Sequence, residues 1–279
     1  MPNYGYHLAR FKGNVVRQLY RAFLPVISRR RISPPRSIAL DVFSYSGQAA
    51  LPEQVASIRS FFRHDGRPKS FTVLSDGSYS DGSVRLLEQI DATVSVQLSI
   101  LPPPDQLPEK FRQYVMTHPT GKQLALIMSL PANGPALYID SDVLFFPAAV
   151  DLVARTTAKQ APAYYLADCQ FSGDARLLRN FSEEKEPANT GVLLLFEKVD
   201  WSLGIDRFLE LEGEPDFFTN QTITHLTMHA NGARPLDPVK YVLQLDDQFV
   251  YADRYAGAAL ALRHYVNPVR HKFWTSLFS

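Results

Sequence analysis

Apolar residues follow a helical period at the start of this chain. Between positions 8 and 23 they recur every three or four residues, which predicts an amphipathic helix with basic side chains on its other faces. The positions are Leu8, Phe11, Val15, Leu19 and Phe23. Pro25 and the Pro34-Pro35 pair end the pattern. Residues 1–36 are therefore expected to form a helical arm with a stiff link to the rest of the chain.

Beyond Ser37 the pattern changes to short apolar runs that alternate with segments of helical spacing. The runs predict strands at residues 38–45, 71–74, 93–98 and 136–139, and the other segments predict helices at 52–62, 84–90, 108–117 and 122–130. Such alternation is typical of an α/β fold, with a mostly parallel central sheet flanked by helices. Residues 37–279 are expected to form one domain that binds its ligands at the carboxyl ends of the strands.

Charge is distributed unevenly between the arm and this body. The arm carries eight basic side chains and no acidic one, whereas the body carries 21 basic and 28 acidic side chains, a net charge of −7. A basic amphipathic helix is typical of contact with anionic lipid, so the arm is a candidate for peripheral membrane binding. The alternatives are an arm helix whose apolar residues pack on the body, or a mobile arm. Nucleic acid is not expected as a partner, because the acidic body repels phosphate.

The composition also bears on the cellular compartment. Cys169 is the single cysteine, which excludes an internal disulfide and is typical of a reducing environment. No run approaches the ~20 apolar residues that a membrane-spanning helix needs. The early apolar segment 22–27 is broken by Pro25 and lacks the features of a signal peptide. We expect a cytoplasmic protein, with attachment at the cytoplasmic membrane face if the arm binds lipid.

Several common catalytic motifs are missing from the sequence. Gly121-Lys122 is not a phosphate-binding loop, because Gln123 stands where Ser or Thr is needed. Residues 76–81 lack the central glycine of a calcium loop. There is no Gly-x-Ser-x-Gly, His-Glu-x-x-His or Cys-x-x-Cys pattern. These absences argue against hydrolase triads and structural zinc sites.

The strongest chemical signal is Asp140-Ser141-Asp142, which lies between the apolar runs 136–139 and 143–146. Carboxylates in apolar surroundings are costly without a partner. Residues two apart on a strand share a face, so the two carboxylates are expected to converge on one cation at a strand end. The alternative is a pair of surface carboxylates that cap the next helix.

With this motif, residues 37–274 resemble the GT-A glycosyltransferase fold, and within it the retaining family of glycogenin and bacterial galactosyltransferases. Three further segments, in the family's order, support the resemblance. Residues 189–194 resemble its Asn-Ala/Ser-Gly-Val segment, residues 220–222 its Asp-Gln-Asp helix start, and residues 264–270 its His-x-x-Gly-x-x-Lys segment. Asn220 replaces an acid, Asn267 replaces a glycine, and Arg270 or Lys272 stands in for the lysine. These departures indicate a divergent relative.

The resemblance implies a Rossmann-like nucleotide-binding half, an acceptor half, and sugar transfer from a nucleotide-diphosphate donor, most simply a UDP-sugar. It assigns Asp140, Asp142 and His264 to a divalent cation. The imidazole favours Mn²⁺ over Mg²⁺. Ser141, within the motif, belongs with the donor-binding residues. Arg270 or Lys272 is expected to bind the diphosphate.

The resemblance also gives a catalytic group, Asp168, Asn189 and Gln221, which would hold the donor sugar and its reacting face. Ser44 and Tyr45 end the first strand and Asp76 follows the second, so they are candidate nucleotide contacts, with Tyr45 stacking on the base.

The family likeness favours retention of configuration. An inverting enzyme would need a carboxylate base, for which Asp246 and Asp247 are candidates.

Simpler interpretations stay open for the single residues. His264 fits a hydrogen-bonded buried histidine, Asn189 a turn, Gln221 the polar face of a helix, and Asp76 a turn. Two other functions also stay open: a metal-dependent phosphohydrolase that uses the same carboxylates to activate water, and a non-catalytic nucleotide-binding or membrane-associated module. The acceptor, whether glycan, lipid or protein, is not identified by any residue.

Overall fold

The computed structural model describes residues 3–98, 107–131, 134–156 and 161–277. The strands are β1 (Asp41–Ser46), β2 (Ser70–Ser75), β3 (Val94–Gln97), β4 (Ala136–Ile139), β5 (Val143–Phe145), β6 (Tyr164–Ala167), β7 (Ala188–Leu195), β8 (Arg234–Pro235), β9 (Tyr241–Val242) and β10 (Leu262–His264). The helices are α1 (Tyr4–Ala22), α2 (Leu24–Arg29), α3 (Leu51–His64), α4 (Asp81–Glu88), α5 (Glu109–Thr117), α6 (Pro119–Met128), α7 (Val150–Thr156), α8 (Ser202–Glu210), α9 (Thr219–Ala230) and α10 (Arg270–Ser276).

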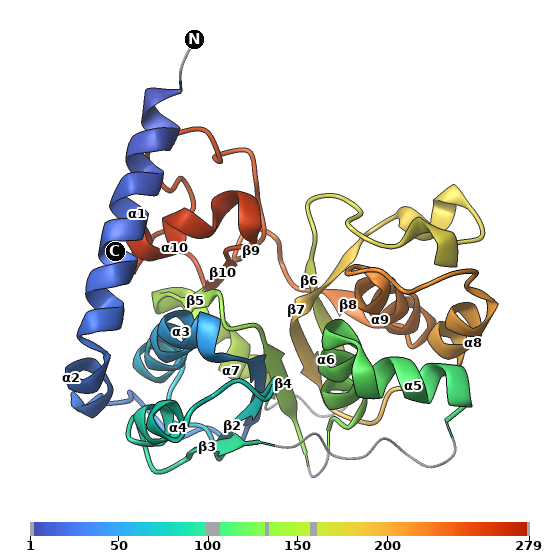
Figure 1. The fold of residues 1–279 in the computed structure, drawn as a ribbon, viewed down its shortest axis with the longest axis horizontal. Helices are drawn as coiled ribbons and strands as arrows, with labels where there is room; N and C mark the ends of the chain where they lie inside the picture. The colour runs from blue at the N-terminus through green and yellow to red at the C-terminus, as the bar shows by residue number, and fades with distance from the viewer. Residues whose placement is uncertain (1–2, 99–106, 132–133, 157–160, 278–279) are drawn as a thin grey trace.

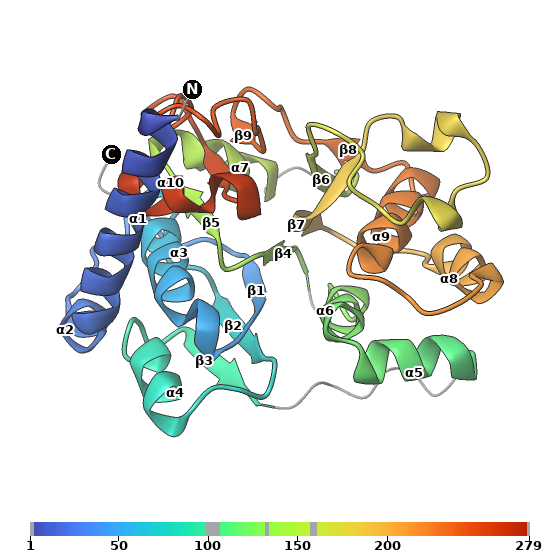
Figure 2. The same ribbon diagram turned by 45° about the horizontal axis from the view of Figure 1, so that its top comes forward.

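Within the described residues, the central sheet has seven strands in the order β3-β2-β1-β4-β7-β6-β8. Strands β1 to β4 are parallel to one another, β6 is parallel to β8, and only β7 runs antiparallel to its two neighbours. A smaller sheet has the order β5-β10-β9. Helices α3 and α4 lie beside the first strands, whereas α5, α6, α8 and α9 gather in the other half of the molecule (Figures 1 and 2). The predicted strands and helices of residues 37–139 are all present, and the mostly parallel sheet is confirmed.

The middle of the sheet separates two hydrophobic cores. Alternate residues of β4 point to opposite faces, so Leu137 and Ile139 belong to the core with α3 and the small sheet, while Ala136 and Tyr138 belong to the core with α6 and α9. Because both faces are covered, β4 reads as a continuous apolar run in the sequence. The polar residues that follow β4 directly are therefore positioned by the end of a buried strand.

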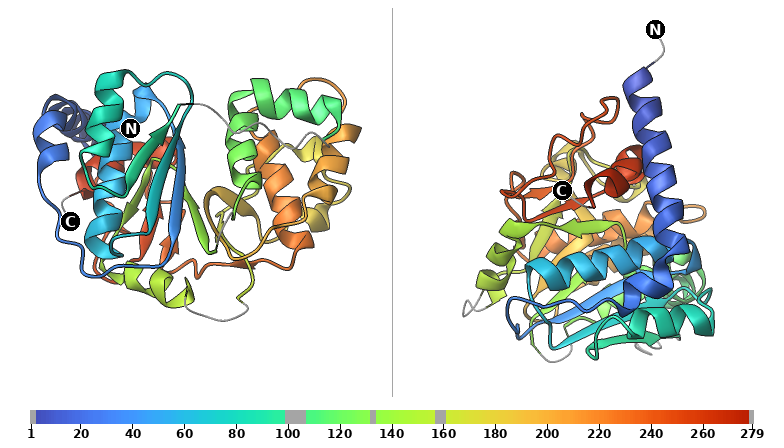
Figure 3. Two further views of the ribbon diagram at one scale, coloured as in Figure 1. Left: turned by 90° about the horizontal axis from the view of Figure 1, so that it is seen from below. Right: turned by 90° about the vertical axis from the view of Figure 1, so that its left-hand side faces the viewer.

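The arm is helical, as predicted, and packs on the body. Helix α1 runs along the outside of the molecule against α10 (Figure 3). Gly13 permits the close approach, since a Cβ there would lie 2.4 Å from the backbone oxygen of His271. Tyr20 packs on the ring of Trp274, with the centroids 5.1 Å apart. No helix in the described part of the chain is long and apolar enough to span a bilayer.

The face of α1 that packs is not its apolar stripe. The contact is made by Ala9, Gly13 and Tyr20, which are buried. The residues of the stripe are exposed by 42–67% and are Leu8, Phe11, Val15, Leu19 and Phe23. The alternative in which the body buries these apolar side chains is therefore wrong, because a different face of the helix makes the contact.

Candidate active site

A cavity of about 690 Å³ opens at the carboxyl ends of β1 and β4. Asp140, Ser141 and Asp142, which follow β4, line it together with Tyr45 of β1. Asp168, which follows β6, also lines it. Its volume lies within the range of about 300–1,000 Å³ that is usual for small-molecule sites. The cavity is where the strand pattern places ligands in a parallel sheet.

Strand pairing brings the two aspartates and a distant histidine together. Residues 140–142 form a turn between β4 and β5 and not an extended strand, so the expectation of two carboxylates on one strand face is corrected. The turn is fixed by a hydrogen bond from the Asp140 amide to the Gly191 carbonyl and by one from the Tyr265 amide to the Asp142 carbonyl. Since β5 pairs antiparallel with β10, His264 lies opposite Val143, the neighbour of Asp142.

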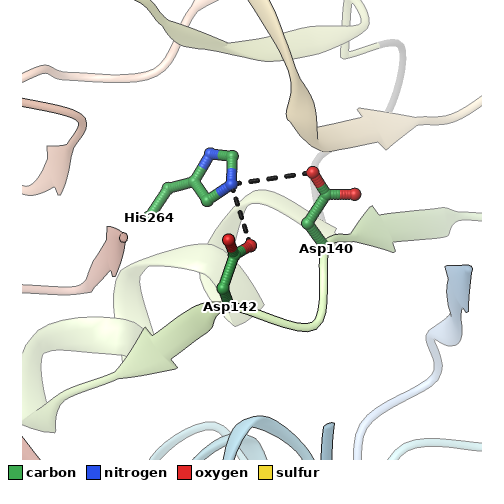
Figure 4. A group of neighbouring side chains, drawn as sticks. All are labelled: Asp140, Asp142 and His264. Atoms are coloured by element: carbon green, nitrogen blue, oxygen red, sulfur yellow. Dashed lines mark hydrogen bonds and ion pairs between the residues drawn. The ribbon is translucent and has the colours of Figure 1, made fainter. Parts of the chain in front are cut away.

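The three side chains converge on one point (Figure 4). His264 Nε2 lies 3.0 Å from Asp142 Oδ1 and 3.6 Å from Asp140 Oδ2. One ligand atom from each residue lies within 4.8 Å of the other two. His264 and Asp142 are buried, while Asp140 is partly exposed to the cavity.

Asn189 determines which nitrogen of His264 faces the carboxylates. Its Oδ1 accepts from the Gly191 amide at 2.8 Å and lies 3.1 Å from His264 Nδ1. Because that oxygen only accepts, Nδ1 carries a proton, and Nε2 is the nitrogen that faces the aspartates. Gly191 is required here: a Cβ would lie 2.2 Å from His264 Cε1.

The three side chains of this group shift one another's pKa values. Burial raises the pKa of Asp140, although His264 opposes the effect. Burial also acts to raise the pKa of Asp142, but His264 and Arg270 outweigh it and lower that pKa to about 2. The pKa of His264 is raised: burial opposes its charge, and Asp142 more than compensates. An imidazole nitrogen between two carboxylates needs either a proton or a cation.

The donor set fits a divalent cation. Two carboxylates and an imidazole suit Mn²⁺ somewhat better than Mg²⁺. The 3.0 Å between His264 Nε2 and Asp142 Oδ1 is about the spacing of adjacent ligands in an octahedral site with bonds of about 2.1 Å. The hydrogen bond at Nδ1 is the support that metal-binding histidines usually have.

Gln123 of α6 holds Asp140 from the other side. Its Nε2 donates to Asp140 Oδ1 at 2.9 Å, and the Tyr138 hydroxyl donates to the same oxygen at 2.8 Å. Its Oε1 accepts from Asn220 of α9 at 3.0 Å. In the sequence Gln123 was only a mismatch to a phosphate-binding loop, so its role at the site was missed.

The residues of the predicted catalytic group contact one another beside His264. Asn189 Nδ2 donates to Asp168 Oδ2 at 3.0 Å and to Gln221 Oε1 at 3.3 Å. Gln221 Nε2 donates to Asp168 Oδ2 at 3.3 Å and to the Ser172 carbonyl at 2.7 Å. Three residues from three separate segments thus form one network beside the candidate metal site.

Of the two basic residues proposed for the diphosphate, the structure places only Arg270 in the cavity. Its Nη2 donates to Asp142 Oδ2, and half of its side chain is exposed. Lys272 is fully buried and donates to the carbonyl oxygens of Val250 and Ala252 at 3.0 and 2.6 Å. The prediction for Lys272 is therefore wrong: two positions along α10 correspond to roughly 200° around a helix, which points it away from the cavity.

Of the three candidate nucleotide contacts, one lines the cavity and two do not. Tyr45 lines the cavity, but Ser44 is buried on the other side of β1 and donates to Gln54 Oε1 at 2.8 Å. Successive strand residues point to opposite faces, so the prediction for Ser44 is wrong. Asp76 accepts from the Ser78 amide and hydroxyl in a turn and does not line the cavity.

Neither candidate base reaches the cavity. Asp247 is fully buried in ion pairs with Arg263 and Lys272. Asp246 accepts from the Tyr255 hydroxyl and is absent from the cavity wall.

The cavity also has residues that the sequence analysis did not single out. Arg17 of the arm reaches the wall beside Glu53, pairs with that carboxylate, and donates to the Ala49 carbonyl at 2.7 Å. Phe217 and Phe218 form an exposed aromatic edge of the cavity. Arg17 lies 36 positions from Glu53, and no local pattern in the sequence indicates the contact.

Solved structures with a similar fold are glycosyltransferases. The galactosyltransferase LgtC, in complex with donor and acceptor sugar analogues, is 15% identical over 85% of this chain and 94% of its own, with a TM-score of 0.59. GlyE of Streptococcus pneumoniae is 14% identical over 86% of this chain and 60% of its own (TM-score 0.53). Mouse xyloside xylosyltransferase 1 is 13% identical over 84% of this chain and 99% of its own (TM-score 0.54).

Sequence comparison adds no relative to these structures. No protein-family model matches the chain, and no curated protein is significantly similar to it in sequence. The fold prediction is confirmed: the chain has the GT-A fold of these glycosyltransferases.

Proposed function

We propose that this protein is a metal-dependent glycosyltransferase that moves a sugar from a nucleotide-diphosphate donor, most simply a UDP-sugar, to a glycan, lipid or protein acceptor. The observation that carries the proposal is the group Asp140, Asp142 and His264, held at the edge of a nucleotide-sized cavity in a GT-A fold. Asp140, Asp142 and His264 would hold Mn²⁺ or Mg²⁺. When bound, the cation supplies positive charge against the leaving diphosphate.

The residues around this group would each contact a different part of the donor. Arg270 adds a second positive charge that favours the leaving diphosphate, and Ser141 offers a hydroxyl within the same turn. Tyr45 presents a ring on which a base can stack. Beside His264, the network of Asp168, Asn189 and Gln221 would orient the sugar hydroxyls. LgtC, which has a similar fold, also has a glutamine in its active site.

The carboxylates of the cavity favour retention of configuration. Inversion needs an unoccupied carboxylate base beside the acceptor. Among the described lining residues, Asp140 and Asp142 belong to the metal group, Glu53 is paired with Arg17, and Asp168 is held by two amides. The exposed aromatic edge would contact the acceptor.

The direct test is turnover of a panel of nucleotide sugars by the full chain, with Mn²⁺ and with a chelator. We expect Mn²⁺-dependent release of UDP from at least one UDP-sugar. Release of phosphate from simple phosphate esters, with no turnover of any nucleotide sugar, would favour a metal-dependent phosphohydrolase. Metal-dependent nucleotide binding without turnover would favour a non-catalytic module.

We also propose that the arm attaches the protein to the cytoplasmic face of an anionic membrane. The exposed stripe of α1 supports this, as do eight basic side chains without an acidic one in residues 1–36. Each basic residue near such a surface contributes about 1 kcal/mol, which offsets the repulsion of the acidic body.

Vesicle binding of full-length variants tests the attachment. Phe11→Gln and Leu19→Gln together are expected to release the protein from anionic vesicles, and rising salt should weaken the wild-type binding. Phe181→Gln changes an equally apolar side chain, 86% exposed, outside the arm and should bind as the wild type does. Equal binding of all variants would contradict the proposal.

A further inference from the structure

A second cavity, of about 390 Å³, lies on the arm side of the molecule between α2, α3 and β5. One part of its wall is apolar and includes Phe23, Val26, Leu144 and Phe146. Arg30, Arg59 and Arg63 also line the cavity. It shares no lining residue with the candidate active site.

The positive charge of this cavity has no protein counterion in the described part of the chain. No described aspartate or glutamate lines it, and none of its three arginines forms an ion pair with a described carboxylate. Arg59 is only 8% exposed and donates a hydrogen bond to the Arg30 carbonyl at 2.9 Å. Burial lowers the pKa of Arg59; Tyr20 opposes the shift, and the charges of Arg63 and Arg30 add to it.

A guanidinium stays protonated even so, because its ordinary pKa is above 12. A buried charge without a partner is costly, and an anion that enters the cavity removes that cost. Arginine binds phosphate oxygens particularly well, through its planar array of donors. The polar end of the cavity therefore suits a phosphate group.

The apolar lining residues suit a hydrocarbon chain. The cavity lies next to the end of the exposed apolar stripe of α1. Phe23 and Val26, exposed by 57% and 67%, line the cavity, and Phe23 is the last residue of the apolar stripe of α1. The stripe extends from Leu8 over fifteen positions, or about 22 Å along the helix. A helix that rests on a bilayer through this stripe would bring the mouth to the lipid headgroups.

We propose that the second cavity binds an anionic phospholipid from the membrane surface. The arginines receive the phosphate headgroup, and the apolar wall receives the start of an acyl chain. The site is separate from the proposed sugar transfer, and it adds a specific lipid contact to the general attraction between a basic arm and an anionic surface.

Calorimetric titration of the full chain with dihexanoylphosphatidylglycerol, kept below the concentration at which it forms micelles, tests the site without a membrane. We expect saturable binding, with clearly weaker binding of dihexanoylphosphatidylcholine, in which the positive choline offsets the phosphate. Glycerol phosphate, which has the phosphate but no acyl chain, is expected to bind at least tenfold more weakly. Equal binding of both lipids would overturn the role of charge. Equal binding of glycerol phosphate would show a site for free phosphates instead.

Two variants place the binding in this cavity. Arg63→Gln removes one guanidinium and leaves the contact between Arg59 and Arg30 intact. Val26→Asp adds a negative charge at an exposed position of the mouth. Each is expected to weaken binding of the anionic lipid about tenfold or more, with an unchanged melting temperature. Arg234→Gln, an exposed arginine on β8, is the matched control. Wild-type affinity in both test variants would overturn the proposal, whether or not the protein transfers sugar.

Discussion

Arg263 and His264 are neighbours on β10, yet they belong to two different kinds of charged site. His264 faces the cavity with Asp140 and Asp142. Arg263 points to the opposite side of the strand, where it pairs with Asp247 and Asp253 and lies between the rings of Tyr255 and Tyr265. The side chain of Arg263 is fully buried.

The two sites differ in how their charges are balanced. In the Arg263 cluster, basic and acidic groups alternate: Lys272 pairs with Asp247, and the Tyr265 hydroxyl donates to Asp253. In the candidate metal group, two carboxylates face one imidazole, one arginine (Arg270) and an open cavity. A closed set of paired charges stabilises a fold, whereas a set with an excess of negative charge at a cavity is suited to a cation.

The largest expected effect is on stability, from the Arg263 cluster. Asp247→Asn leaves buried positive charges without their partner and should lower the free energy of unfolding by about 3–5 kcal/mol. The affinity of the folded protein for Mn²⁺ should not change. Denaturant unfolding and metal titration measure the two quantities.

Asp246→Asn is the control, because that neighbouring carboxylate is 56% exposed and its loss should cost no more than about 0.5 kcal/mol. If both variants are equally stable, the paired charges of the Arg263 cluster do not stabilise the fold.

At Gly191 the expected effect is on metal binding. An alanine Cβ would displace the His264 ring from Asp142 and Asn189, so Gly191→Ala should weaken Mn²⁺ binding by about a hundredfold. Gly82→Ala has ordinary space around the new methyl group and should bind metal normally. Unchanged metal affinity in Gly191→Ala would remove His264 from the site.

A smaller effect is expected where Gln123 supports Asp140. Gln123→Leu removes a hydrogen bond to the carboxylate and should weaken Mn²⁺ binding about tenfold. Gln113→Leu, at an exposed position of the neighbouring helix α5, should have no effect. Metal titrations that give the same affinity for both variants would show that Gln123 does not support the ligand.

The smallest effect concerns pH. Burial acts to raise the pKa of Asp247, but the hydrogen bond and charge of Arg263 outweigh it and lower that pKa. The stability from Asp247 is therefore complete above its unfolded pKa of about 3.9 and is lost as the pH falls through the folded value. The difference in unfolding free energy between wild type and Asp247→Asn should narrow below about pH 4. A constant difference from pH 6 to pH 3, measured by denaturant unfolding, would contradict this assignment.

The sequence predicted the elements that hold the site, because strand and helix periods are local. It also indicated the candidate metal group, since Asp140 and Asp142 are two positions apart and His264 lies in a recognisable segment. It assigned Lys272 wrongly because a run of basic residues does not show which face of α10 each occupies. Gln123 and Arg17 were missed because their partners lie far away in the chain. The exposed stripe of α1 was visible as a pattern, but only packing shows that Ala9 and Gly13 make the contact.

The central claim is that Asp140, Asp142 and His264 hold a divalent cation to which a nucleotide diphosphate binds. Calorimetric titration with UDP, in the presence of Mn²⁺ and of a chelator, tests it on wild type and Asp142→Asn. We predict that the wild type binds UDP only with Mn²⁺, and that Asp142→Asn does not bind it although its unfolding transition remains cooperative. Binding of UDP to Asp142→Asn with wild-type affinity and the same dependence on Mn²⁺ would contradict the account.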